Sequence, residues 1–345
     1  MENILQLRIV SIKQETAEAK TFGLEPLNGA VDFLPGQFLT FIFPFEHETL
    51  RRSYSIVSLP GEPLKITVQR VENGAVSRYV LIHWKKGMII DALPPAGRFT
   101  LSPQSVFPRD IFFMAAGSGI TPILPLIRSL LSEEPQSRIH LLYSNRNEES
   151  ILFNDELEQL EKENSQFNIL HFLSNPKQNW EQRMRLNNGV LEPLIHERMQ
   201  FEPSKAVFMI CGPFTYMRMA RLTLIYMKFD EEQVKIENFL PEILRSGTRP
   251  APRFPARFVT VILKDQKYRF EVSSGKSILR AALEAGIQLP YSCEGGICSA
   301  CATICRNGKV KMSINEVLTS TDMENGWVLT CTGYPASDDV QLEYP

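Results

Sequence analysis

CEGGICSAC occupies residues 293–301, and 29 residues separate its last cysteine from Cys331. The spacing C-x4-C-x2-C with a distant fourth cysteine matches the thiolate ligands of plant-type [2Fe–2S] centres. Each of two irons needs two thiolates, so a short loop wraps one side of the cluster and the distant cysteine completes it. Gly295 and Gly296 let the loop backbone approach the inorganic sulfides. We predict a [2Fe–2S] cluster on Cys293, Cys298, Cys301 and Cys331.

A zinc site or a set of buried structural thiols is the alternative. Zinc sites usually combine paired C-x2–4-C knuckles, whereas this sequence has one such pair and a lone fourth cysteine. Cys305 competes as a ligand because it lies four residues after Cys301, but its place beside an expected strand favours a buried thiol. Five of the six cysteines fall in the last 53 residues, which argues against a secreted disulfide scaffold.

The pattern of expected strands and one helix in residues 258–345, which contain the cysteine loop, predicts an α+β domain. Upstream, residues 243–257 hold three Pro, one Gly and four Arg without an apolar period, as in a semi-extended linker. The domain resembles plant-type ferredoxins over its whole length, which implies a β-grasp fold and one-electron transfer. The expected strands are residues 257–265, 266–272, 309–312 and 340–345, and the expected helix is residues 277–287.

Residues 104–242 alternate strands with helices, which predicts an α/β domain with a parallel sheet covered on both faces. GSGITP at residues 117–122 follows the first strand. Its glycines allow a tight turn, and the start of the next helix offers N–H groups to a pyrophosphate. The third glycine of G-x-G-x-x-G and the later acid are absent. The expected strands are residues 110–116, 139–145, 168–174, 206–212 and 234–239, and the helices are residues 120–134 and 151–164.

Two further strand ends in this part carry candidate residues. Cys211-Gly212-Pro213 ends a strand on the side where open α/β sheets bind ligands. Arg146 follows another strand, where an adenosine ribose would lie. Its guanidinium either pairs with a 2′-phosphate, favouring NADPH, or is a solvated loop charge. The choice between NADH and NADPH stays open.

Residues 1–103 predict an antiparallel β-barrel with one helix at Val76–Trp84. Short apolar runs are broken by Pro and Gly about every ten residues. RSYS at residues 52–55 supplies an Arg for a flavin phosphate, a Tyr for the isoalloxazine ring and a Ser for its N5 edge. GAVS at residues 74–77 would open a helix facing the pyrophosphate. RSYS alone also suits a barrel strand with a surface Arg and a core Tyr. The short apolar runs that predict the barrel strands are residues 5–15, 20–27, 33–44, 54–60 and 64–72.

These motifs together, with PGQF at residues 35–38, resemble the ferredoxin–NADP reductase superfamily. The resemblance implies FAD, because GAVS fits the pyrophosphate turn of FAD members; FMN members share the barrel and domain order and remain the alternative. It also implies which residues bind the flavin and the nicotinamide. For the flavin these are Arg52, Ser53, Tyr54 and Ser55, with Gly74, Val76 and Ser77 at its phosphate, Arg51 as a second basic neighbour, and Glu237 and Phe239 near the ring. For the nicotinamide they are Gly117, Gly119, Thr121, Cys211, Gly212 and Pro213, with Cys211 as a pocket wall or a buried thiol.

The order of flavin barrel, nicotinamide domain and ferredoxin resembles the reductase components of multicomponent oxygenases, such as phenylacetyl-CoA epoxidases, phthalate dioxygenases and steroid hydroxylases. NAD(P)H gives up two electrons as a hydride, whereas the cluster accepts one, and a flavin can do both. We therefore expect an NAD(P)H-dependent oxidoreductase that passes electrons through the flavin and cluster to a terminal oxygenase. No catalytic acid–base residue is expected. A non-oxygenase acceptor, such as a hybrid-cluster protein, and a slow-turnover redox sensor are the alternatives.

Composition excludes several other classes of protein. The chain has 345 residues, 43% of them apolar, and 37 Lys and Arg against 39 Asp and Glu. Without a basic excess a nucleic-acid partner is not expected. No apolar stretch approaches the length of a membrane span. The N-terminus lacks a basic segment followed by an apolar one, so we expect a cytoplasmic protein with no membrane partner.

Overall fold

The computed structural model describes most of the chain in two compact units, which comprise residues 3–237 and the segment from residue 238 onward. The gaps in this description include most of the expected linker, so residues 243–251 and 253 lie outside it. The described residues are 4–44, 49–72, 74–104, 106–178, 183–239, 252, 254–296, 298–315 and 317–344.

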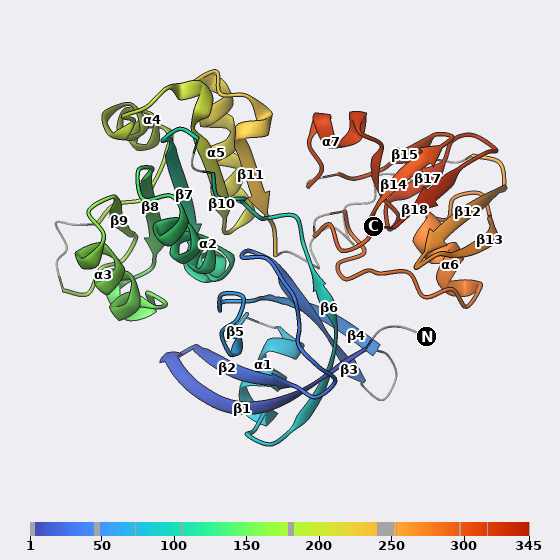
Figure 1. Ribbon diagram of the computed structural model, residues 1–345, viewed down its shortest axis with the longest axis horizontal. Coiled ribbons are helices and arrows are strands. Elements are labelled where there is room, and N and C mark those ends of the chain that lie inside the picture. Colours follow the sequence, from blue (N-terminus) through green and yellow to red (C-terminus); the bar gives the residue numbers. More distant parts are fainter. Residues whose placement is uncertain are drawn as a thin grey trace. The chain divides into compact units, whose positions relative to one another are not determined.

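The first part of the larger unit is a six-stranded antiparallel sheet in the order β4-β3-β6-β1-β2-β5. An antiparallel bridge between Ile56 and Ile66 joins its two edges, so the sheet closes into the predicted barrel (Figure 1). Its strands are β1 (Leu5–Thr16), β2 (Ala19–Pro26), β3 (Phe38–Pro44), β4 (Thr49–Ser55), β5 (Leu64–Gln69) and β6 (Ile89–Ala96), and its helix is α1 (Ala75–His83).

The barrel interior is aromatic and aliphatic. Trp84, which caps α1, meets Phe22 edge-on with ring centroids 5.2 Å apart and stacks on Phe43 at 6.0 Å. Alternate residues of β1, such as Leu7 and Ile9, are fully buried against them. This alternation is the period-2 pattern that indicated strands in the sequence. The run predicted at residues 54–60 is strand only through Ser55, because the chain leaves β3 there.

The second part of the larger unit is a parallel sheet in the order β11-β10-β7-β8-β9. Side chains of β7 alternate between two buried clusters, with Phe113 in one and Phe112 in the other, so helices cover both faces as predicted (Figure 1). The strands are β7 (Asp110–Ala116), β8 (Arg138–Asn145), β9 (Phe167–Leu173), β10 (Val207–Cys211) and β11 (Val234–Glu237), and the helices are α2 (Ile120–Glu133), α3 (Asn154–Glu163), α4 (Asn188–Arg198) and α5 (Phe214–Tyr226).

The helix predicted from residue 151 begins later, at Asn154. Phe153 adopts a left-handed backbone with φ 58°, and the side chains of Ile151 and Leu152 fill the core before the helix starts. Burial of these apolar residues therefore takes precedence over helical continuity.

The second unit contains a five-stranded mixed sheet in the order β13-β12-β18-β14-β16. Strands β12 and β18 are parallel, and α6 packs its buried residues Leu279 and Ala282 into the same core as these strands. This is the predicted α+β arrangement. Its elements are β12 (Arg257–Leu263), β13 (Gln266–Val272), α6 (Ile278–Glu284), β14 (Ala302–Asn307), β15 (Val310–Met312), α7 (Ser320–Glu324), β16 (Trp327–Leu329), β17 (Gly333–Pro335) and β18 (Gln341–Glu343).

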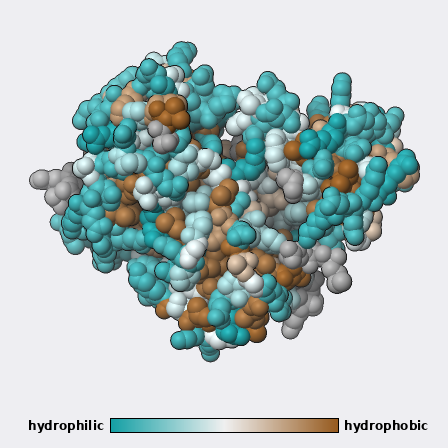
Figure 2. Space-filling model, viewed as in Figure 1, coloured by the Kyte–Doolittle hydropathy of each residue, from teal (hydrophilic) through white to brown (hydrophobic). Residues whose placement is uncertain are grey.

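Apolar residues lie mainly in these cores. The face of the molecule in Figure 2 is covered largely by hydrophilic residues, with hydrophobic ones in smaller groups. Among the described residues, no helix is both long enough and apolar enough to span a bilayer.

Gly36 gives a test of how the barrel joins the parallel sheet. Its φ is +91°, and a Cβ there would lie 1.9 Å from the carbonyl oxygen of Phe99, a residue whose ring lies in the core of the parallel sheet. We expect Gly36→Ala to lower the free energy of unfolding by about 3 kcal/mol, through backbone strain and overpacking.

Gly29→Ala is the matched control, because Gly29 has φ +103° but nothing within 4 Å of its added Cβ. Strain alone predicts a loss of about 1 kcal/mol there. Denaturant unfolding of both variants measures the difference, and equal losses would show that the close approach to Phe99 contributes nothing.

Candidate functional site

The predicted nicotinamide residues lie at the carboxyl ends of two neighbouring strands. The chain leaves β7 on one side to form β8 and returns on the other side to form β10, so the switch point of the sheet lies between β7 and β10. Open α/β sheets bind ligands at this point. The turn Gly117–Gly119 follows β7, and Cys211 and Gly212 end β10.

Glycine is required where these two strand ends approach. A Cβ on Gly119 would lie 2.0 Å from the carbonyl oxygen of Cys211, and one on Gly212 would lie 2.9 Å from the Cβ of Ala116. Gly117 has a positive φ of 54°. The Thr121 hydroxyl donates to the Ser118 carbonyl at 2.9 Å and thereby closes the turn. Helix α2 starts here without a side-chain cap, the arrangement that suits a pyrophosphate at a helix N-terminus.

Cys211 lies at the end of β10, beside the glycine turn. It is fully buried and pairs in register with Glu237 on β11. Burial, reinforced by the neighbouring Glu237 carboxylate, raises the pKa of the Cys211 thiol well above its ordinary value. The thiol is therefore neutral near pH 7 and is not activated as a nucleophile.

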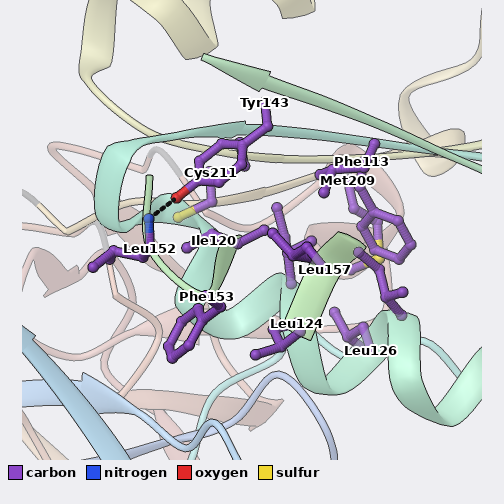
Figure 3. Close-up of a cluster of buried hydrophobic side chains, with 14 of the residues drawn as sticks. Phe113, Ile120, Leu124, Leu126, Tyr143, Leu152, Phe153, Leu157, Met209 and Cys211 are labelled. Atoms are coloured by element: carbon purple, nitrogen blue, oxygen red, sulfur yellow. Dashed lines mark hydrogen bonds between the residues drawn. The ribbon is translucent and has the colours of Figure 1, made fainter. Parts of the chain in front are cut away.

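Tyr143 is a buried contact of the glycine turn that the sequence analysis missed. It is fully buried on β8, and its hydroxyl donates to the Gly117 carbonyl at 3.1 Å. The same hydroxyl accepts the Leu152 N–H at 3.3 Å, as Figure 3 shows. Tyr143 thus links the glycine turn to the segment before α3. Only its place on a buried strand signalled it, and that place does not distinguish it from other core residues.

Two further nicotinamide candidates, Arg146 and Pro213, and one flavin candidate, Phe239, lie outside this turn. Arg146 follows β8 with an exposed side chain, and its carbonyl accepts the Asn175 N–H at 2.7 Å. Pro213 caps the N-terminus of α5. Phe239 follows β11 by two residues, is 39% exposed and belongs to the second unit.

The flavin motif lies on β4, paired with β3 from Thr49 to Ser55. Strand alternation places Arg52 and Tyr54 on one face. The Tyr54 ring packs beside Phe41 at 6.0 Å between centroids, and burial raises its pKa more than the nearby Arg52 charge lowers it. The hydroxyl of Ser53 contacts that of Thr40 at 2.9 Å, and Ser55 is buried. Arg51 is buried too, and its carbonyl accepts from Arg52 Nη1 at 2.8 Å.

The turn before α1 is tightly built. The Ser77 hydroxyl accepts the Val71 N–H at 3.1 Å and donates to the Gly74 carbonyl at 3.3 Å. A Cβ on Gly74 would lie 2.8 Å from that hydroxyl. Val76 is buried beneath the turn. Because the Ser77 hydroxyl is already engaged, backbone N–H groups of α1 are the donors this turn offers to a phosphate.

The cysteine loop of the second unit is held in an unusual backbone conformation. Glu294 and Ser299 have φ values of 52° and 53°, and Gly296 has 76°. A Cβ on Gly296 would lie 2.6 Å from the carbonyl oxygen of Ile314. This conformation turns backbone N–H groups towards sulfur, since Gly295 donates to Cys293 Sγ and Cys293 to Cys298 Sγ, both at 3.4 Å.

The four predicted cluster ligands face one another. Cys298, Cys301 and Cys331 are buried and Cys293 is partly buried. The pKa of the Cys298 thiol is raised mainly by its contact with Cys293 and further by burial. Contacts with Cys293 and Cys301 likewise raise the pKa of the Cys331 thiol. In the described part of the chain no three His, Cys, Asp or Glu side chains form a ligand set for one metal ion. The predicted [2Fe–2S] cluster needs two thiolates on each of its two irons, so all four thiols would be used.

Cys305 is placed apart from these four thiols. Its Sγ contacts the carbonyl oxygens of Asn307 at 3.2 Å and Gly308 at 3.8 Å. Burial raises the pKa of its thiol. The contacts of Cys305 are those of a structural thiol.

Family models match all three parts of the chain. An oxidoreductase FAD-binding domain matches residues 6–101, and an oxidoreductase NAD-binding domain matches residues 113–222. A 2Fe-2S iron-sulfur cluster binding domain matches residues 261–336. The chain is therefore an NAD(P)H-dependent oxidoreductase with FAD and a [2Fe–2S] cluster.

Relatives match the chain over its full length. It is 33% identical to a component of the 1,2-phenylacetyl-CoA epoxidase of Escherichia coli K12, over 100% of this chain and 98% of that protein. It is 32% identical to the ferredoxin reductase component of 3-ketosteroid-9-alpha-monooxygenase from Mycobacterium tuberculosis H37Rv, over 99% and 96% of the two chains. The chain belongs to the ferredoxin–NADP reductase superfamily, in its group of oxygenase reductases with a C-terminal [2Fe–2S] domain.

Solved structures share this architecture. Phthalate dioxygenase reductase, described as a modular structure for electron transfer from pyridine nucleotides to [2Fe–2S], has 25% identity and a TM-score of 0.59 over 99% of this chain and 98% of its own. A type IV self-sufficient cytochrome P450 monooxygenase has a TM-score of 0.74 over 98% of this chain and 41% of its own, at 20% identity. The second likeness shows the fold alone.

Cys331→Ser tests the ligand assignment. Loss of one of four thiolates is expected to leave less than about half the wild-type iron and acid-labile sulfide, since a thiolate ligand is missing. NAD(P)H should still reduce the flavin. Cys305→Ser is the control and should keep its cluster; a normal cluster in Cys331→Ser would refute the assignment.

Tyr143→Phe tests the link to the glycine turn. It removes one hydroxyl and leaves the Leu152 N–H and a carbonyl lone pair of Gly117 unpaired, at a cost of about 1–3 kcal/mol. We expect KM for the preferred coenzyme to rise about tenfold at unchanged FAD content. Tyr226→Phe, at a side chain 72% exposed on α5, should match the wild type. An unchanged KM in Tyr143→Phe would show that the hydroxyl does not shape the coenzyme site.

Proposed function

We propose that this chain is the electron-supplying reductase of a multicomponent oxygenase of the phenylacetyl-CoA epoxidase or ring-hydroxylating kind. The observation that carries the proposal is similarity along the whole chain, in one domain order, to reductase components of such systems. The absence of a spanning helix among the described residues accords with a place in the cytoplasm, which we include in the proposal.

The cofactors supply the chemistry: a bound flavin takes two electrons with a hydride from NAD(P)H and passes them singly to a [2Fe–2S] cluster. We assign the flavin to β4 and the start of α1. There Arg52 supplies positive charge to a phosphate, and Tyr54 and Ser55 face the ring and its N5 edge. Gly74, Val76 and Ser77 shape the turn whose N–H groups receive the pyrophosphate.

We assign the nicotinamide coenzyme to the crevice between β7 and β10. Gly117, Gly119 and Thr121 form the floor of the turn, and Cys211, Gly212 and Pro213 form the opposite wall. The neutral thiol of Cys211 neither attacks nor titrates near pH 7. Glu237 lies in register beside it, and Phe239 and Arg146 are assigned to the flavin ring and the adenosine ribose.

Reconstitution with candidate oxygenases tests the proposal. The purified holoprotein, NADH or NADPH, and substrate are combined with the catalytic subunits of a phenylacetyl-CoA epoxidase or with a ring-hydroxylating oxygenase. Cytochrome c, which takes single electrons, is the control acceptor. We expect coenzyme-dependent product with one of the two oxygenases.

Two negative outcomes of this experiment have different meanings. Reduction of cytochrome c without product from either oxygenase would indicate a non-oxygenase acceptor. Absence of coenzyme-dependent cytochrome c reduction, with FAD and cluster bound, would indicate a redox sensor and would contradict the proposal.

A further inference from the structure

A bidentate ion pair joins the barrel to the parallel-sheet part of the larger unit. Arg128 lies on α2, two turns after Thr121, and Glu62 lies in the connection between β4 and β5. Arg128 Nη1 donates to Glu62 Oε2 at 3.0 Å and Nη2 donates to Oε1 at 2.5 Å. The Arg128 and Glu62 side chains are only 25% and 33% exposed. Two parallel hydrogen bonds fix orientation as well as distance.

Both partners are restrained on their own side. The Leu59 N–H donates to Glu62 Oε2 at 2.9 Å, and the Glu62 N–H donates to the Leu59 carbonyl at 3.1 Å. Partial burial opposes ionisation of Glu62, but the hydrogen bonds from Arg128 and Leu59 outweigh it and lower the carboxyl pKa. Arg128 Nε also approaches Glu156 Oε1 on α3, at 3.5 Å.

The ion pair lies beside an apolar junction. Val57 and Phe99 of the barrel belong to the same buried cluster as Leu124 and Ile127 of α2. The junction is therefore close-packed and does not slide freely. The charged pair adds a directional contact to this packing.

The elements that meet here are those that carry the two proposed cofactor motifs. Strand β4 holds Arg52, Tyr54 and Ser55 and ends seven residues before Glu62. Helix α2 begins at the glycine turn and reaches Arg128 within nine residues. The ion pair therefore lies one short connection away from the flavin motif and about two helical turns away from the glycine turn.

We propose that the Arg128–Glu62 ion pair is a positioning contact for hydride transfer between NAD(P)H and the flavin. It fixes α2 and the preceding turn Gly117–Gly119 against the connection that follows β4. This inference rests on the proposed function. In that transfer a hydride leaves C4 of the nicotinamide for N5 of the flavin, giving NAD(P)⁺ and reduced flavin. Displacement of reacting groups by about 1 Å can slow such a step about a hundredfold. Arg128 and Glu62 are positioning residues and not catalytic ones.

The variants Glu62→Gln and Glu156→Gln form a matched pair. Each removes one carboxylate charge from the same guanidinium, but only the first breaks the contact between the barrel and the parallel-sheet part. Anaerobic stopped-flow with saturating coenzyme measures the first-order rate of flavin reduction. We expect Glu62→Gln to lower this rate about tenfold and Glu156→Gln to remain within about twofold of the wild type.

A second readout does not depend on turnover. A nicotinamide ring stacked on a flavin gives long-wavelength charge-transfer absorbance, which is recorded with NAD⁺ or NADP⁺ on the photoreduced holoprotein. We expect this band to weaken in Glu62→Gln and to persist in Glu156→Gln. FAD content and thermal midpoint, measured alongside, report simple destabilisation.

A double variant with the two charges swapped tests the inference even if Glu62→Gln is unstable. The double variant Glu62→Arg with Arg128→Glu restores an ion pair of reversed direction and should recover at least about a third of the wild-type reduction rate, whereas each single reversal should not. Equal rates and equal bands in Glu62→Gln and wild type would overturn the inference, as would equal losses in Glu62→Gln and Glu156→Gln. A wild-type flavin that neither coenzyme reduces would instead contradict the proposed function.

Discussion

The close approach of two strand ends is the constraint on which the larger unit depends. The backbone of Gly119 passes so near the Cys211 carbonyl that a Cβ would come within 2.0 Å of it. This approach lets α2 start directly over the end of β10, with its first N–H groups at the switch point of the sheet. Tyr143 fixes the same turn from the side of β8. The proposed nucleotide site therefore rests on backbone geometry, with few charged side chains.

The iron–sulfur part depends on a comparable constraint. Contacts with neighbouring cysteines, together with burial, raise the pKa of the Cys298 and Cys331 thiols, and bound metal makes a deprotonated set of thiolates favourable. The loop reaches this geometry through left-handed residues at Glu294, Gly296 and Ser299. In both parts of the protein, the proposed cofactor sites lie on glycine-dependent turns beside packed sheets.

The features that the sequence predicted depend on residues that lie close together in the chain. The cysteine spacing, GSGITP and RSYS are short patterns whose chemistry needs fixed spacing, and the three domain types followed from them. The sequence analysis did not predict helices α4 and α5 individually. Pro193 interrupts the helical pattern of α4, and α5 has apolar residues around most of its circumference. Tyr143 and the Arg128–Glu62 pair were missed because their partners lie 26 and 66 residues away, and no spacing rule connects such positions.

An anaerobic visible-absorption titration of the holoprotein with NADH, and then with NADPH, tests the electron path most directly. The account predicts that the preferred coenzyme bleaches the flavin bands and the [2Fe–2S] bands in the same experiment, since electrons pass from the flavin to the cluster. Bleaching of the flavin while a bound cluster stays oxidised would contradict it, because the two centres would then not be connected.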